Sequence, residues 1–269
     1  MASTPPSPTR PSTEAANPPS LATVFAGIVV ALAISWAYVI YMVWGMAHMD
    51  VSAHWLLMPR MDNWNGVDVL LVFVMWAIMM AAMMLPSAVP TLLLLAKTNY
   101  VRYGQRRANL ATGVSGLGYI TAWVGFSLLA TLAQWGLLTA RLVSPMMESL
   151  SPIFSSVLLM AAGAYQFTPF KDACLSRCRS PLSLLMTGGS DGLQGAFFMG
   201  IRQGAYCTGC CWLLMALLFA FGVMNLIWIA ALSLVVLLEK LLQRPRWFSH
   251  LLGGLLLVWG LWLAGRAAL

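Results

Sequence analysis

The sequence predicts an all-α protein: a polytopic bundle of about seven transmembrane helices, or six, with a cytoplasmic N-terminus. Of its 269 residues, 60% are hydrophobic and 9% are charged, whereas a soluble domain has roughly 25% charged residues. Several apolar runs reach the ~20 residues that a helix needs to cross a bilayer. This composition argues against soluble enzymes, nucleic-acid-binding proteins and secreted disulfide scaffolds.

The first twenty residues are rich in Pro, Ser and Thr and predict a disordered tail, and residues 21–269 predict a transmembrane helical domain. Seven apolar runs are expected to span the membrane. They cover residues 21–47, 67–97, 114–139, 152–170, 205–221, 223–242 and 247–264. Pro86 and Pro90 predict a kink or a break in the second run. The fifth and sixth runs meet at Gly222, which predicts a tight hairpin. The glycine-rich stretch 183–203 is expected to be a loop, an interfacial helix or a re-entrant hairpin.

The basic residues orient these runs. With the N-terminus inside, all of the 15 Lys and Arg residues except Arg60, Arg141 and Arg266 fall on the cytoplasmic side. Loops rich in Lys and Arg stay in the cytoplasm. The formal net charge of +7 therefore reflects topology, and nucleic acid is not expected as a partner.

All five cysteines lie in a cytoplasmic segment at about residues 171–211. They are Cys174, Cys178, Cys207, Cys210 and Cys211. On helices, Cys174 and Cys178 share one face, as do Cys207 and Cys211. Two such pairs brought together would surround a soft metal such as Cu(I), or zinc. Lys171, close to Cys174, would favour the thiolate. The alternatives are small packing residues or a redox-active pair.

Methionine is also concentrated. Five of the 18 methionines occur in the run MWAIMMAAMML: Met75, Met79, Met80, Met83 and Met84. Met75, Met79 and Met83 fall on one helix face, and we expect that face to point inward, near Met160 or Met215. Thioethers bind Cu(I) well, so the run could conduct copper. The alternative is that it fills the core, because methionine packs well between helices.

A third candidate site follows the first span on the outer side, where His48, Met49 and His54 are interleaved. Imidazole accepts Cu(II) and thioether accepts Cu(I), which suits copper capture. The alternative is an ordinary interfacial loop. Glu239 and Lys240 end the sixth run, where ionisable residues are either functional or lie at the headgroup level.

Several motifs of enzymes and pumps do not occur. The sequence has no GxxxxGK[ST], HExxH or GxSxG motif. It offers no combination of nucleophile, base and orienting group. We therefore predict that the protein is not an enzyme.

Three segments resemble an uncharacterised bacterial family of predicted metal-binding integral membrane proteins. The segments are MWAIMMAAMMLPSAVP, AYQFTPFKDACLSRCRSPL and the stretch that begins GAFFMGIRQGAYCTGCCW. The resemblance covers about residues 65–265. It implies a metal without naming one, with the five cysteines as ligands and with four methionines as further ligands: Met79, Met80, Met83 and Met84.

Two functions follow from these observations. The first is a metal-binding protein of the bacterial inner membrane that handles copper for transport or for delivery to a metalloenzyme. The second is a non-catalytic subunit of a larger membrane complex, with structural or zinc-binding cysteines. The expected partners are the lipid bilayer, other membrane subunits or a metalloenzyme. Thiol–disulfide exchange by Cys207 and Cys210 is less favoured, because the cytoplasm is reducing.

Overall fold

The computed structural model describes residues 21–47, 65–103, 105–142, 151–179, 192–242 and 245–268. Every element in these ranges is a helix. The helices are α1 (Leu21–Ala47), α2 (Gly66–Tyr103), α3 (Gln105–Thr139), α4 (Pro152–Tyr165), α5 (Pro169–Arg179), α7 (Leu193–Ala216), α8 (Leu218–Phe221), α9 (Leu226–Leu241) and α10 (Pro245–Ala268). The predicted tail, residues 1–20, lies outside the described residues.

Five helices are long and apolar enough to cross a membrane, namely α1, α2, α3, α7 with α8, and α10. A sixth candidate span is the pair α4 and α5, which is bent by 66°. The sixth predicted run, residues 223–242, corresponds to α9, whose 16 residues fall short of the ~20 needed to cross a bilayer. The all-helical class is confirmed with five to six candidate spans, and the count of seven stays a prediction.

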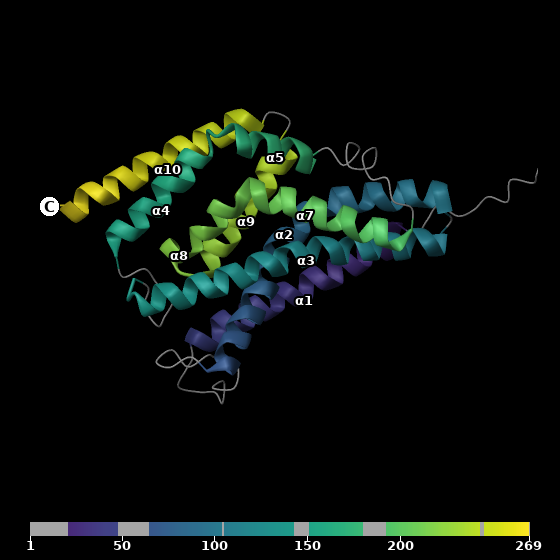
Figure 1. Ribbon diagram of the computed structural model, residues 1–269, viewed down its shortest axis with the longest axis horizontal. Coiled ribbons are helices and arrows are strands. Elements are labelled where there is room, and N and C mark those ends of the chain that lie inside the picture. Colours follow the sequence, from purple (N-terminus) through teal and green to yellow (C-terminus); the bar gives the residue numbers. More distant parts are fainter. Residues whose placement is uncertain are drawn as a thin grey trace, which may run out of the picture.

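The helices form two groups, visible in Figure 1. One group contains α1, α2, α3 and α7, in which α2 packs on α1 and α3, and α3 packs on α7. In the other group α4 and α10 lie side by side. The helices α5 and α9 contact α7 and each other. The five cysteines lie at this junction, on α5 and α7.

The glycine-rich stretch 183–203 was expected to precede the fifth span, and this boundary is wrong. Helix α7 begins at Leu193, so residues 193–203 are part of the span. Gly200 lies against the backbone of Ser115 on α3, and Gly118 on α3 lies against the backbone of Phe197. A Cβ atom at either glycine would collide with main chain. These glycines are therefore contact points between close-packed helices and do not mark a loop.

The bend between α4 and α5 follows from the sequence Thr168–Pro169. Proline disfavours the helical conformation for the residue before it but suits the first position of a new helix. The Thr168 hydroxyl accepts a hydrogen bond from the Lys171 amide at 3.3 Å, so Thr168 caps α5. This new start turns the segment that carries Cys174 and Cys178 towards α7.

Helix α2 runs through Pro86 and Pro90 without a break. Of the two expected outcomes, a kink or a break, the break is therefore wrong. Proline leaves the carbonyl four residues earlier without its helical donor. For Pro86 that carbonyl belongs to Ala82, and the indole of Trp36 on α1 donates to it at 3.1 Å. A neighbouring helix thus satisfies the freed group. The predicted boundary at Gly222 is confirmed: α8 ends at Phe221, the φ of Gly222 is 95°, a conformation that favours glycine, and α9 begins at Leu226. The tight hairpin expected there stays a prediction.

Candidate metal centre

The thiol cluster, defined as the five cysteines, is assembled from two helices. Cys174 and Cys178 lie on α5, and Cys207, Cys210 and Cys211 lie on α7; all five are buried and free of disulfides. Helix α5 packs directly on α7, and the Cys178 carbonyl accepts a hydrogen bond at 3.1 Å from the Gln203 side chain of α7. The predicted approach of the two cysteine elements is therefore confirmed. Cys174 packs against Gly209, where an added Cβ would lie 3.0 Å from its sulfur.

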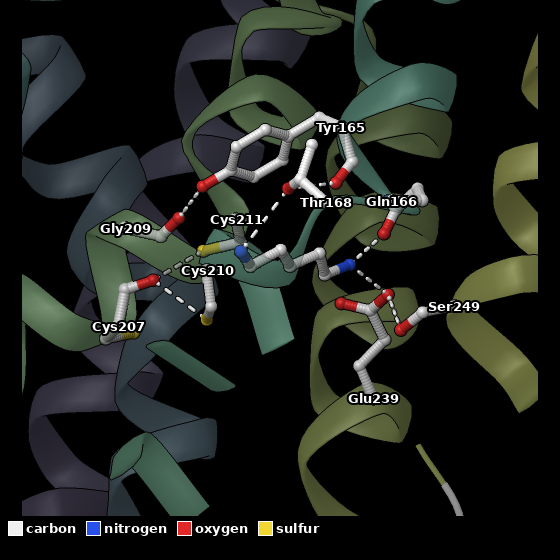
Figure 2. A network of polar contacts seen from close by, with 10 residues as sticks. Tyr165, Gln166, Thr168, Cys207, Gly209, Cys210, Cys211, Glu239 and Ser249 are labelled. Atoms are coloured by element: carbon white, nitrogen blue, oxygen red, sulfur yellow. Dashed lines mark hydrogen bonds and ion pairs between the residues drawn. The ribbon is translucent and has the colours of Figure 1, made fainter. Parts of the chain in front are cut away.

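Two thiols of the cluster are engaged with the backbone of α7. The sulfurs of Cys210 and Cys211 donate to the Cys207 carbonyl at 3.0 and 3.1 Å (Figure 2). Metal binding by either would replace that bond and release the thiol proton. Among the residues that the structure describes, no group of three His, Cys, Asp or Glu side chains is arranged to hold a metal ion.

Cys207 has the most polar surroundings of the five. Lys240 on α9 places its ammonium 2.8 Å from the Cys207 sulfur and 2.7 Å from the Ser87 hydroxyl on α2. The Tyr119 hydroxyl on α3 lies 3.0 Å from the same sulfur. A cation in direct contact stabilises a thiolate. The cation beside the thiols is thus Lys240, and the expectation that Lys171 fills this role is wrong.

Lys171 instead belongs to a buried ion pair. Its ammonium lies 2.5 Å from a Glu239 carboxylate oxygen, with side-chain exposures of 0% and 1%. Lys171 also donates to the Gln166 amide oxygen, and the Ser249 hydroxyl of α10 donates to Glu239 at 2.9 Å (Figure 2). The network joins α5 to α9 and α10. Glu239, at the end of an apolar run, is buried and not at an exposed surface.

Tyr165, the last residue of α4, also supports the cluster. Its hydroxyl donates to the Gly209 carbonyl (Figure 2), and its ring packs edge-on to Trp212 with centroids 5.9 Å apart. Gly209 lies between Cys207 and Cys210 on α7. The corner between α4 and α5 is therefore anchored directly beside the thiols. The sequence did not predict this contact, because Tyr165 and Gly209 lie far apart in the chain.

The methionine ladder, defined as Met75, Met79, Met80, Met83 and Met84, faces the core of the bundle. Its members are at most 3% exposed, and Met215 belongs to the same core. The predicted inward orientation is confirmed. Met160 instead packs against Gly260 on α10.

The ladder and the thiol cluster meet at Met84. The Tyr119 hydroxyl that contacts the Cys207 sulfur also donates to the Met84 carbonyl at 3.3 Å. Ser87, which accepts from Lys240, donates to the same carbonyl at 2.7 Å. The last residue of the ladder is therefore one side chain away from the thiols. The residues of the third candidate site, His48, Met49 and His54, lie outside the described part of the chain.

The fold and the site define a helical membrane protein whose interior holds a concentration of soft, sulfur-containing metal ligands. The particular family follows from comparison with known proteins. The chain belongs to the PpoB2 family of copper chaperones, whose model matches residues 73–263. No curated protein and no solved structure matches the chain.

Family membership implies copper binding, which confirms copper as the metal favoured by the sequence. It also confirms the prediction of a protein that handles a soft metal, and it replaces the unnamed metal of the resemblance with copper. The matched region contains the whole ladder and all five cysteines. It begins after His48, Met49 and His54.

Proposed function

We propose that this protein carries Cu(I) as cargo between the methionine ladder and the thiol cluster and delivers it to a metalloenzyme. The observation that carries the proposal is the proximity of the two sulfur-rich groups, because Tyr119 touches both the main-chain carbonyl of Met84 and the Cys207 sulfur. Thioethers and thiolates are ligands that Cu(I) prefers, and here both are buried in the same core. Membership in the copper chaperone family supports this use.

The proposed ligands at the thiol end are Cys178, Cys207 and Cys210, three buried cysteines of the packed helices α5 and α7. Cys174 and Cys211 flank them and take part in exchange. Three thiolates around Cu(I) carry two net negative charges, and burying charge requires partners. Lys240, in contact with Cys207, supplies one compensating charge. Lys171 cannot, because Glu239 already neutralises it.

The proposal places the protein in the bacterial inner membrane with seven spans and a cytoplasmic N-terminus. The distribution of Lys and Arg supports this orientation. Reporter fusions at Gln105 and Leu269 should then indicate opposite compartments, and the same compartment for both would exclude seven spans. His48, Met49 and His54 are the proposed capture ligands on the outer side. The protein acts by binding and release, without catalysing a reaction.

A Cu(I) titration of the purified full chain tests the proposal, with bicinchoninate as the competing chelator. Residues that only hydrogen-bond to metal ligands typically contribute 10- to 100-fold to metal affinity, and loss of a ligand itself should cost more. We therefore expect Cys178→Ser or Cys207→Ser to weaken Cu(I) binding by at least about 100-fold. Ser176→Ala, an exposed position on the same helix as Cys178, is the matched control and should bind normally. Unchanged binding in both cysteine variants would refute the proposed site.

A further inference from the structure

Two arginines from different helices meet on one tyrosine next to the thiol cluster. Arg177 of α5 donates to the Tyr206 hydroxyl at 3.1 Å, and Arg202 of α7 donates to it at 3.3 Å. Their guanidinium carbons lie 5.3 and 5.8 Å from the centre of the Tyr206 ring. Both arginine side chains are exposed. Two positive charges are therefore held against the same neutral group.

These two charges are not neutralised within the part of the chain that the structure describes. The ion pairs found there join Lys171 to Glu239 and Arg246 to Asp172. Each guanidinium has five N–H donors, and Tyr206 accepts only one from each. Most donors of the pair are free to bind a carboxylate, for which guanidinium is geometrically suited.

The pair lies at the surface end of the thiol cluster. Arg177 precedes Cys178 and Tyr206 precedes Cys207 in the chain. Arg177 is close enough to Cys174 for its charge to act on that thiol. Cys174 is also the most exposed cysteine, at 8% compared with 0% for Cys207. An anion bound by the arginines would thus lie near the outermost thiol.

We propose that Arg177 and Arg202 bind a small, carboxylate-bearing thiolate complex of Cu(I) and present its copper to Cys174. This inference rests on the proposed function. Both guanidinium groups reach one atom, the Tyr206 hydroxyl oxygen. Their remaining donors are therefore close enough together to bind one carboxylate of a small molecule, and they suit it better than an extended acidic surface. The Cys174 sulfur is recessed, so a small thiol reaches it more readily than a folded protein does.

The transfer is a ligand exchange. The bond between copper and the carrier sulfur breaks as a bond between copper and the Cys174 sulfur forms. The proton of the Cys174 thiol passes to the departing carrier thiolate. Copper remains Cu(I) throughout, so the step needs no oxidant or reductant. The reverse exchange would return copper to the carrier.

The test compares two Cu(I) carriers with the full chain in nanodiscs of phosphatidylcholine. Cu(I)–glutathione carries carboxylates, and Cu(I)–2-mercaptoethanol does not. Local charge commonly changes association rates by 10- to 1,000-fold, so we expect the double variant R177Q/R202Q to accept copper from Cu(I)–glutathione at least about 10-fold more slowly at low salt. Transfer from Cu(I)–2-mercaptoethanol and the equilibrium affinity for Cu(I) should be unchanged. R107Q, at an exposed arginine of α3, is the control.

Equal rates for wild type and variant, or equal slowing with both carriers, would overturn the inference; an acidic protein partner would then be the next hypothesis. Slowing that occurs only with phosphatidylglycerol in the discs would also overturn it, in favour of a lipid headgroup. Both outcomes differ from failure of the proposed function. In that case the wild-type chain would itself bind no Cu(I).

Discussion

The methionine ladder and the thiol cluster are both built from buried sulfur, but they are assembled and supported differently. All members of the ladder lie on α2 and are at most 3% exposed. The thiol cluster is divided between α5 and α7. Its surroundings include the Lys240 ammonium, the Tyr119 hydroxyl and, one residue from Lys240, the ion pair of Glu239 with Lys171.

The difference follows from the chemistry of the two ligands. A thioether binds metal without losing a proton, so it needs no compensating charge and can be surrounded by apolar residues. A thiol becomes an anion when it binds metal, and a buried anion needs a nearby cation or hydrogen bonds. The ladder therefore requires only one helix with methionines on its inner side. The cluster requires several helices to bring charges and donors together.

The largest effect is expected from breaking the ion pair of Lys171 with Glu239, which supports the thiol cluster and has no counterpart in the methionine ladder. Glu239→Gln leaves the Lys171 ammonium buried without a counterion, and breaking such a pair typically costs 3–5 kcal/mol. We expect the free energy of unfolding to fall by about that amount in denaturant titrations of the detergent-solubilised protein. Cu(I) affinity at the thiols should fall as well, because the pair ties α5 to α9.

The matched control replaces both partners, as Lys171→Met with Glu239→Leu. Exchange of a whole buried pair for apolar residues is often neutral or stabilising, so this double variant should be close to wild type in stability. If it were as unstable as Glu239→Gln, the loss would come from packing and not from an uncompensated charge.

The next effect concerns the packing of α7 on α3, which holds Cys207 against Tyr119. In Gly200→Ala the new methyl group meets the Ser115 backbone, and α7 must move away from α3. Overpacking costs 1–3 kcal/mol, and we expect a loss of about 3 kcal/mol because backbone cannot yield. Movement of α7 also separates Cys207 from Tyr119, so Cu(I) binding should weaken.

Gly116→Ala on α3 is the control for that variant, since an added Cβ there meets nothing within 4 Å. Alanine is favoured over glycine within a helix by roughly 0.5–1 kcal/mol. Thermal unfolding should therefore place this variant at or above wild type. A similar destabilisation in both glycine variants would show that the close contact between α3 and α7 is unimportant.

The smallest effect on stability, and the sharpest on function, is expected in the ladder. Replacement of Met75, Met79 and Met83 by leucine conserves volume, and such exchanges usually cost less than ~1.5 kcal/mol each. Leucine has no lone pair to offer Cu(I). The triple variant should fold and bind Cu(I) at the thiols in detergent, but in proteoliposomes copper should reach the thiols more slowly. Thiolate-to-Cu(I) absorbance measures that loading.

Met160→Leu is the control for the ladder, because Met160 packs on α10. It should load at the wild-type rate. If the triple variant also loaded at that rate, the methionines of α2 would serve only as packing and the conduit would have to be abandoned.

The sequence by itself determined the helical membrane class, most span positions and the composition of both the methionine ladder and the thiol cluster. Hydrophobic length identifies spans because crossing hydrocarbon requires about 20 apolar residues. Helical periodicity placed Met75, Met79 and Met83 on one face, since residues i and i+4 are neighbours on any helix. These are local properties of the chain, and they need no knowledge of which helices touch.

Only the tertiary structure decided which residues surround the thiols. Lys171 is near Cys174 in the chain, yet Lys240 from a distant helix contacts Cys207. The glycines near residue 200 resembled a loop, because glycine is common both in turns and in close helix contacts. Which lysine, tyrosine or glycine meets a given sulfur depends on how helices far apart in the chain pack against each other. That packing results from many weak contacts across the bundle. Hydropathy and periodicity describe one segment at a time and carry no information about those contacts.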